Sequence, residues 1–177
     1  MKKSLVLLLL STTGALTCKA QLMHSNENVK LTLPSGTYKL NQQQVDALPG
    51  IKLSKKLSQS YDIPYNYKIG DIYIGLFNVN KDFINNDLPG KKLSQDEVYN
   101  FLKSYGNDTY NSAIKNIGKN RLLLISYTIN HIGKYRFDYQ NESKTLTQAG
   151  EIDYPENQKE KATALLNEIL NSIRFIE

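Results

Sequence analysis

Cysteine, histidine and tryptophan are scarce in this sequence of 177 residues, which has one cysteine, two histidines and no tryptophan. The cysteine, Cys18, lies in the N-terminal segment, so the remaining chain can form no internal disulfide and offers no thiol nucleophile. The histidines, His24 and His131, lie far apart, and no His or Cys pair has the spacing of metal ligands. We therefore expect no metal site and no cofactor, and a fold stabilised by packing alone.

Short catalytic motifs are also missing. The sequence has no G-x-S-x-G nucleophile elbow, and its glycines at Gly70 and Gly118 stand alone rather than in a phosphate-binding loop. We expect His131, next to Ile132-Gly133, to be a loop residue. No catalytic and no cofactor-binding residue is predicted from motifs.

Dense runs of basic residues are absent as well. The formal net charge is +5, but Lys2, Lys3 and Lys19 lie in residues 1–20, where no acidic residue occurs, so the remaining chain carries only +2. Its lysines and arginines are interspersed with acidic residues. This pattern argues against a nucleic-acid partner.

Long hydrophobic runs are confined to the N-terminus. Met1-Lys2-Lys3 is a short positive region and Leu5 to Leu10 an apolar one, too short for a permanent transmembrane helix. Residues 1–20 are predicted to be a removable export signal of bacterial type. The protein is then expected in the periplasm or attached to the outer membrane, without a membrane span.

Two processing routes remain open. Cleavage after Ala20 places small residues, Cys18 and Ala20, at the −3 and −1 positions and leaves Gln21 as the new N-terminus. Cleavage before Cys18 would make that cysteine a lipid anchor. Ala15-Leu16-Thr17 is a poor lipobox, yet the only cysteine of the chain falls where a lipobox cysteine must fall.

Apolar alternation predicts most of the strands. Residues 21–28 are polar and read as a flexible leader, and a single domain over 29–177 follows. The structure of 51–67 is left open. Strands are predicted at Val29 to Leu33, Tyr38 to Leu40, Asp71 to Val79 and Leu122 to Ile129, with a hairpin of the segment around Tyr135 to Gln140 and Thr145 to Tyr154.

Three helices are expected. Asn41 and Gln44 form a capping box for a short first helix, with Leu40 and Val45 as its hydrophobic staple. A second capping box, Ser94 to Glu97, predicts a helix whose apolar face includes Val98. The last helix begins near Pro155 and carries an apolar stripe at helical spacing, made of Ala162, Leu165, Leu166, Ile169, Leu170 and Ile173. Together these elements predict an α+β fold with a largely antiparallel sheet flanked by helices.

The two ends of the predicted domain resemble those of a known family. An apolar strand ending in Leu33-Pro34-Ser35-Gly36 opens the domain, and the amphipathic helix closes on Asn171-Ser172-Ile173-Arg174-Phe175. With the strands between, this order is similar to the Mog1/PsbP-like family, which includes small exported bacterial proteins and lipoproteins. The resemblance implies a three-layer α/β/α sandwich and a binding or accessory role without catalysis, and it places no functional residue.

Three functions are compatible with this sequence. The first is a cell-envelope protein that binds a protein or small molecule, with Tyr61, Tyr65 and Tyr67 as its candidate partner surface because tyrosines supply large contact areas. The second is an immunity protein against a toxin delivered to the periplasm. The third is a hydrolase using Glu151 or Asp153, which flank Ile152 on one strand face and would have to line a cleft.

Overall fold

Two antiparallel sheets form the framework of the molecule. The computed structural model describes residues 21–48, 63–81, 87–103 and 109–176. In these ranges the larger sheet has the strand order β3-β4-β5-β9-β8-β7-β6, and the smaller has the order β1-β2-β10. The strands are β1 (Met23–Ser25), β2 (Val29–Thr32), β3 (Tyr38–Lys39), β4 (Tyr65–Ile69), β5 (Ile72–Leu76), β6 (Asn111–Ile117), β7 (Asn120–Ile129), β8 (Ile132–Gln140), β9 (Thr147–Pro155) and β10 (Arg174–Phe175).

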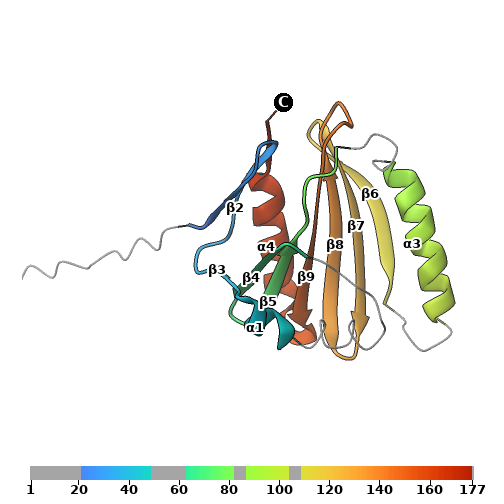
Figure 1. The fold of residues 1–177 in the computed structure, drawn as a ribbon. Coiled ribbons are helices and arrows are strands. Elements are labelled where there is room, and N and C mark those ends of the chain that lie inside the picture. The colour runs from blue at the N-terminus through green and yellow to red at the C-terminus, as the bar shows by residue number, and fades with distance from the viewer. Residues whose placement is uncertain (1–20, 49–62, 82–86, 104–108, 177) are drawn as a thin grey trace, which may run out of the picture.

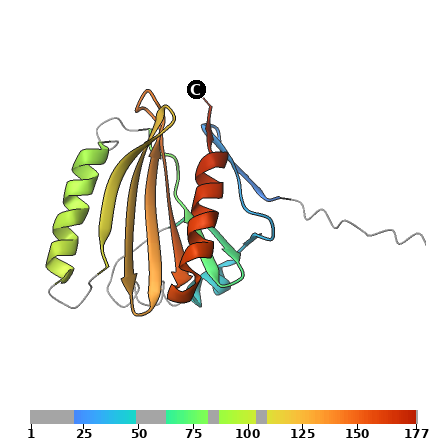
Figure 2. The same ribbon diagram turned by 180° about the vertical axis from the view of Figure 1, so that it is seen from behind.

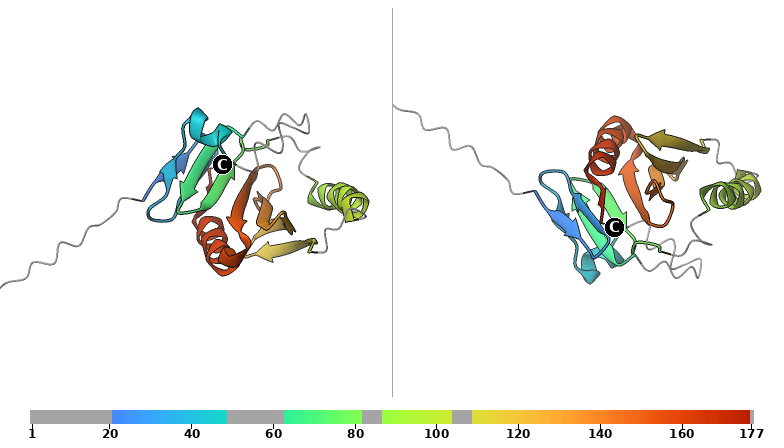
Figure 3. Two further views of the ribbon diagram at one scale, coloured as in Figure 1. Left: turned by 90° about the horizontal axis from the view of Figure 1, so that it is seen from below. Right: turned by 90° about the horizontal axis from the view of Figure 1, so that it is seen from above.

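Helices lie on both faces of the larger sheet (Figures 1 and 2). They are α1 (Gln42–Asp46), α3 (Leu88–Lys103) and α4 (Lys159–Ser172), the last preceded by the 3₁₀ turn η2 (Glu156–Gln158). Figure 3, seen along the sheet, shows α4 on one side of β7–β9 and α3 on the other. The predicted three-layer α/β/α arrangement with an antiparallel sheet is confirmed.

The main core lies between α4, the larger sheet and β2. All six residues of the predicted helical stripe are buried, and Ile169 is fully enclosed. They pack against alternate residues of the strands, such as Ile74, Phe137 and Ile152, and against Val29 and Leu31 of β2. Because a strand presents every second side chain to one face, α4 and β2 together can bury these alternate residues.

The opposite face is covered by two smaller clusters rather than one core. Near β5, Tyr73 packs with Leu40, Val45 and Ile63 beside α1. At the other end, Leu88 of α3 packs on Leu123 and Ile125 of β7. The candidate site lies on this face, between α3 and the sheet.

The two predicted helix starts had different outcomes. The capping box of α1 is present: Gln44 N–H donates to Asn41 Oδ1 and Asn41 N–H donates to Gln44 Oε1, both at 2.9 Å. The predicted start of the second helix at Ser94 is wrong, because α3 begins at Leu88. Asp87 caps it, accepting from Gly90 N–H at 2.9 Å.

The chemistry of the Asp87 segment explains this earlier start. An acidic cap followed by proline in the first turn begins a helix as well as a capping box does. Pro89-Gly90 therefore lies inside the first turn of α3. Val98, expected on the buried face of this helix, is 52% exposed.

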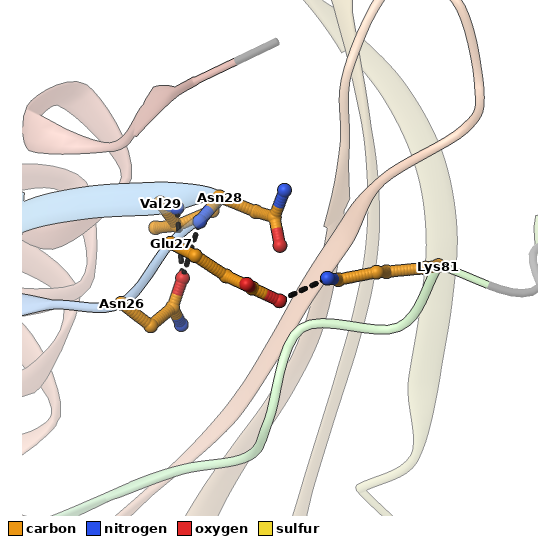
Figure 4. Close-up of polar contacts among 5 residues, drawn as sticks. All are labelled: Asn26, Glu27, Asn28, Val29 and Lys81. Carbon is orange, nitrogen blue, oxygen red and sulfur yellow. Dashed lines mark hydrogen bonds and ion pairs between the residues drawn. The ribbon is translucent and has the colours of Figure 1, made fainter.

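The flexible leader expected over 21–28 contains a strand in its central part. Met23–Ser25 pairs with β2, and His24 is only 4% exposed. Asn26 Oδ1 accepts from the N–H groups of Asn28 and Val29 and so closes the β1–β2 turn (Figure 4). In the same close-up, Glu27 forms an ion pair with Lys81, which follows β5. The folded domain thus includes residues before Val29.

Two further points concern the strands. The sequence analysis did not identify β6, which pairs with the whole first part of β7 and forms one edge of the larger sheet. The helix end expected at Gly106-Asn107 and the turn at Asn85-Asn86 lie outside the described residues. No helix in the described ranges is long and apolar enough to cross a membrane.

Candidate functional site

A cleft of about 480 Å³ lies between α3 and the larger sheet. Its size falls in the range of sites for small organic ligands. The residues that line it come from α3, β7, β8, β9 and the segment after β5: Phe77, Gly90, Lys91, Ser94, Gln95, Leu123, Ile125, Arg136, Phe137, Asp138, Ala149 and Gly150. The cleft therefore depends on elements that are distant in sequence and meet only in the folded chain.

The two walls of the cleft differ in polarity. On the sheet side, Leu123 and Ile125 of β7 present buried apolar side chains, Arg136 and Asp138 of β8 lie next to them, and Ala149 follows on β9. On the helix side, Lys91, Ser94 and Gln95 present polar groups. A cleft that combines apolar surface with a few polar groups is typical of small-molecule sites.

Polar contacts also attach α3 to the sheet. Lys91 Nζ lies 2.7 Å from Asp138 Oδ1 on β8. Asp96 accepts from Ser112 Oγ at 2.5 Å and from Tyr110 Oη at 2.8 Å. The hydrogen bonds from Lys92 and then Ser112 lower the pKa of the Asp96 carboxyl below its ordinary value, while burial and the Asp96 contact raise the pKa of Tyr110 to about 12.

Aromatic stacking supplies a further contact of α3. The rings of Tyr99 and Tyr110 are stacked with centroids 3.9 Å apart. Leu93 and Val98, in contrast, are exposed. The residues of the helix that line the cleft are thus polar or small, while Leu88 makes the apolar contact with Leu123 and Ile125.

A ladder of ion pairs extends from the cleft along β8 and β9. Lys134 faces Asp153 and Arg136 faces Glu151 across the two strands, and both pairs form salt bridges, the second at 3.8 Å from Nε to Oε2. Burial, and then the neighbouring Asp153 charge, raise the pKa of Glu151. Asp153 Oδ1 is buried with no hydrogen-bond partner among the described residues.

Tyr73 and Gly75 of β5 complete this charged surface. Tyr73 Oη donates to Asn66 Oδ1 at 2.7 Å, and burial followed by the charges of Glu151 and Asp153 raises the pKa of Tyr73. A Cβ at position 75 would lie 2.7 Å from Tyr73 Oη and 3.2 Å from Glu151 Cγ. Glycine at this position therefore lets both polar side chains lie flat on the sheet.

The structure brings Glu151 and Asp153 together on one face but not into the cleft. Their side chains are 11% and 15% exposed, so they do not project into bulk solvent. Neither lines the cleft, whereas their strand neighbour Arg136 does. The two carboxylates are thus paired with cations beside the cleft.

The predicted tyrosine surface is not assembled as expected. Tyr61 lies outside the described residues. Tyr67 is 5% exposed, and its hydroxyl is hydrogen-bonded to His24 Nδ1 at 3.0 Å. Tyr65 is half-buried and contacts the His24 ring edge-on, with centroids 4.4 Å apart. Tyr67 is therefore a core residue, and its buried position excludes it from a contact surface.

The two histidines occupy opposite kinds of environment. His24 is buried in the core edge, where burial and then the charge of Lys39 lower its pKa. His131 is in a turn with φ of 62°, and its exposed ring lies 3.5 Å from Glu156. The described residues contain no group of three or more His, Cys, Asp or Glu side chains able to hold a metal ion. Cys18 lies outside the described residues.

Sequence reasoning missed the cleft residues Arg136, Asp138 and Lys91. The one sequence signal for Arg136 and Asp138 is that charged residues alternate along both β8 and β9. Opposite charges at matching positions of a hairpin indicate a paired ladder on one face.

Comparison with solved structures defines the fold. The solution structure of cyanobacterial PsbP from Synechocystis sp. PCC 6803 is similar with a TM-score of 0.56 and 12% identity, over 94% of this chain and 99% of that one. The Ran-binding protein Mog1p of Saccharomyces cerevisiae gives 0.47 and 10%, over 90% and 97%. No protein-family model matches the chain, and no curated protein matches its sequence. The chain has the Mog1/PsbP-like fold that its sequence suggested, and the comparison concerns the fold alone.

Proposed function

We propose that this chain is a binding protein of the bacterial cell envelope that holds a small molecule, without chemistry, in the cleft between α3 and the sheet. The observation that carries the proposal is the cleft itself, about 480 Å³, lined by both apolar and polar side chains. A cleft between distant elements with a few convergent polar groups is the usual form of a ligand site.

The state of the charged groups supports binding over catalysis. A general acid or base must reach the substrate, so a catalytic carboxylate should line the cleft. Asp138, the carboxylate that lines it, is bound to Lys91 at 2.7 Å. Glu151 and Asp153 lie outside the lining and are paired with Arg136 and Lys134.

The test is native mass spectrometry of the chain purified under non-denaturing conditions from the envelope of cells that express it. We expect a small-molecule adduct on the wild-type chain. Ala149→Leu, which fills the floor of the cleft, should remove the adduct. Ala113→Leu, a matched change on β6 outside the cleft, should retain it. Equal adducts on both variants, or none on the wild type, would contradict the proposal.

The envelope location rests on the sequence of residues 1–20. Its positive start, short apolar run and small residues before Gln21 support export, and Cys18 supports a lipid tether as the alternative end product. Cell fractionation together with the intact mass of the mature protein separates the routes. An unmodified chain beginning at Gln21 indicates a released protein, and a lipid-modified N-terminal Cys18 indicates a tethered one. An uncleaved cytoplasmic chain would refute export.

A hydrolase is the second candidate, because one observation favours it. Glu151 is buried and its pKa is raised, as in a general acid, while Asp153 lies beside it on the same strand face. The candidate requires a substrate to reach Glu151 from the cleft past Arg136. Glu151→Gln would then abolish turnover of a substrate that still binds. If Glu151→Gln leaves turnover unchanged, this candidate is refuted.

A further inference from the structure

The smaller sheet presents an exposed face that carries two cations. Burial alternates along its strands, so that Val29 and Leu31 of β2 face the core and the side chains between them face outward. The cross-strand register places Lys30 of β2 between Ser25 of β1 and Arg174 of β10. The residues that share this outer face are Met23, Ser25, Lys30, Thr32 and Arg174.

Lys30 and Arg174 are like charges placed directly opposite each other, an arrangement that weakens a sheet. Arg174 has a structural role, because its Nη1 donates to the carbonyl oxygens of Asn171 and Ile173 at 2.7 and 2.9 Å, where α4 ends. Lys30 forms no ion pair and no side-chain hydrogen bond with any described residue. Contacts within the fold therefore do not explain a lysine at position 30, whereas an anionic surface against this face does.

The acidic residue of the β1–β2 turn is engaged elsewhere. Glu27 points toward Lys81, which follows β5, and forms an ion pair with it (Figure 4). It is the only acidic residue among the described residues of 21–33 and 173–176. The outer face thus carries two positive charges without a counter-ion from its own strands.

The position of β1 in the chain indicates what this face would meet. Five residue steps separate Cys18 from Met23, and an extended chain of that length spans at most about 18 Å. A lipid on Cys18 would therefore hold the smaller sheet close to the membrane. Met23 is apolar and 65% exposed, and an apolar side chain beside cations is typical of surfaces that bind the interface of an anionic membrane.

We infer that the outer face of the smaller sheet docks the domain on a membrane of anionic phospholipids, with Lys30 and Arg174 against the headgroups and Met23 in the interface. This inference goes beyond the ligand cleft. α3, which forms one wall of the cleft, lies at the other end of the molecule from β1 and β2 (Figures 1 and 3). A docked domain would therefore keep its cleft away from the lipid.

Chemical labelling of lysines tests this contact in the tethered chain. The chain beginning at Cys18 is coupled through this thiol to a maleimide-bearing lipid, in phosphatidylethanolamine vesicles that also contain either phosphatidylglycerol or phosphatidylcholine. Acetylation and mass spectrometry should show Lys30 labelled at least about threefold less on the phosphatidylglycerol vesicles. Lys115, an exposed lysine of β6, is the internal control and should be labelled equally on both. Equal labelling of Lys30 on both vesicles, or the same protection of Lys115, would overturn the inference.

Co-sedimentation of the untethered chain beginning at Gln21 with the same two lipid mixtures gives a second measurement, made at low ionic strength because salt screens exposed charges. We expect the wild type to prefer phosphatidylglycerol vesicles and Lys30→Gln to bind them about fivefold more weakly, as one cation near an anionic surface contributes. Lys115→Gln removes the same charge on β6 and should change the binding by less than about twofold.

Urea unfolding separates lost docking from lost structure. Lys30→Gln removes a like-charge pair and should be no less stable than the wild type. Equal loss of vesicle binding by Lys30→Gln and Lys115→Gln would assign the binding to net charge and refute the outer face as the docking surface. Equal binding of the wild type to both kinds of vesicle would refute the inference as well, while the adduct experiment judges the cleft separately.

Discussion

Lys91 on α3 and Asp138 on β8 form an ion pair of 2.7 Å that joins the helix to the sheet at the cleft. Both residues also line the cleft. The contact that holds the helix over the sheet is therefore part of the candidate site. A ligand in the cleft would lie beside a charge pair whose strength depends on solvent access.

The first prediction concerns the strength of this pair. A double-mutant cycle with Lys91→Met and Asp138→Asn should give a favourable coupling of up to about 1 kcal/mol in urea unfolding, because both side chains are partly exposed. The coupling should decrease in high salt, since salt screens exposed charges. A coupling of zero at low salt would show that the pair does not hold α3.

The second prediction concerns pH and His24. Burial lowers the folded-state pKa of His24 below its ordinary value of 6.5, so the unfolded chain binds the proton more readily. Stability should therefore fall as the pH drops below about 6.5, until the folded-state pKa is passed, and should be unaffected by this group at higher pH.

Urea unfolding of wild type and His24→Phe between pH 5 and pH 8 measures this effect. The variant should lack the part of the acid slope that His24 causes. His131→Phe, in the exposed turn, is the matched control and should retain the slope. Identical slopes in the wild type and His24→Phe would mean that His24 is solvated and β1 does not bury it.

The third prediction tests where α3 begins. Asp87→Ala removes the side chain that accepts from Gly90 N–H and should cost about 1 kcal/mol in the free energy of unfolding. Ser94→Ala, at the start expected from sequence, lies inside the helix and should cost less than about 0.5 kcal/mol. If Ser94→Ala costs more free energy of unfolding than Asp87→Ala, the helix begins at Ser94 rather than at Leu88.

The fourth prediction concerns the main core. Ile169 of α4 is fully buried among the residues of both sheets, and Ile169→Ala should destabilise the fold by about 2 to 5 kcal/mol. Leu93→Ala on the exposed part of α3 should change stability by less than about 0.5 kcal/mol. Equal effects in urea unfolding would show that α4 is not the helix that seals the sheet.

Local patterns predicted the elements that depend on local chemistry. The α4 stripe, the β8–β9 hairpin and the α1 capping box each repeat or pair over a few residues, and all three are present. β6 was missed because its residues are only partly buried and alternate weakly, as suits an edge strand. β1 was missed because its three residues carry one buried side chain, His24, whose burial depends on Tyr65 and Tyr67 of a distant strand.

The cleft could not be predicted for a related reason. Its sheet side comes from β7, β8 and β9 and its other wall from α3, and their contact depends on the pairing of β6 with β7 and on the ion pair of Lys91 with Asp138. No residue spacing in the sequence predicts this contact between α3 and the sheet. The opposite charges at matching positions of β8 and β9 predict a ladder, but they do not show which of its residues line a cleft.

The absence of tryptophan in the chain allows a direct measurement on the cleft. Gln95→Trp places the only indole in the lining of the cleft, and Glu97→Trp places it on the exposed side of α3. Each variant is titrated with the small-molecule extract of the cells that express the chain. We predict a saturable change in fluorescence for Gln95→Trp and none for Glu97→Trp. No saturable change at position 95, or the same change at both positions, would contradict the assignment of the cleft as the binding site.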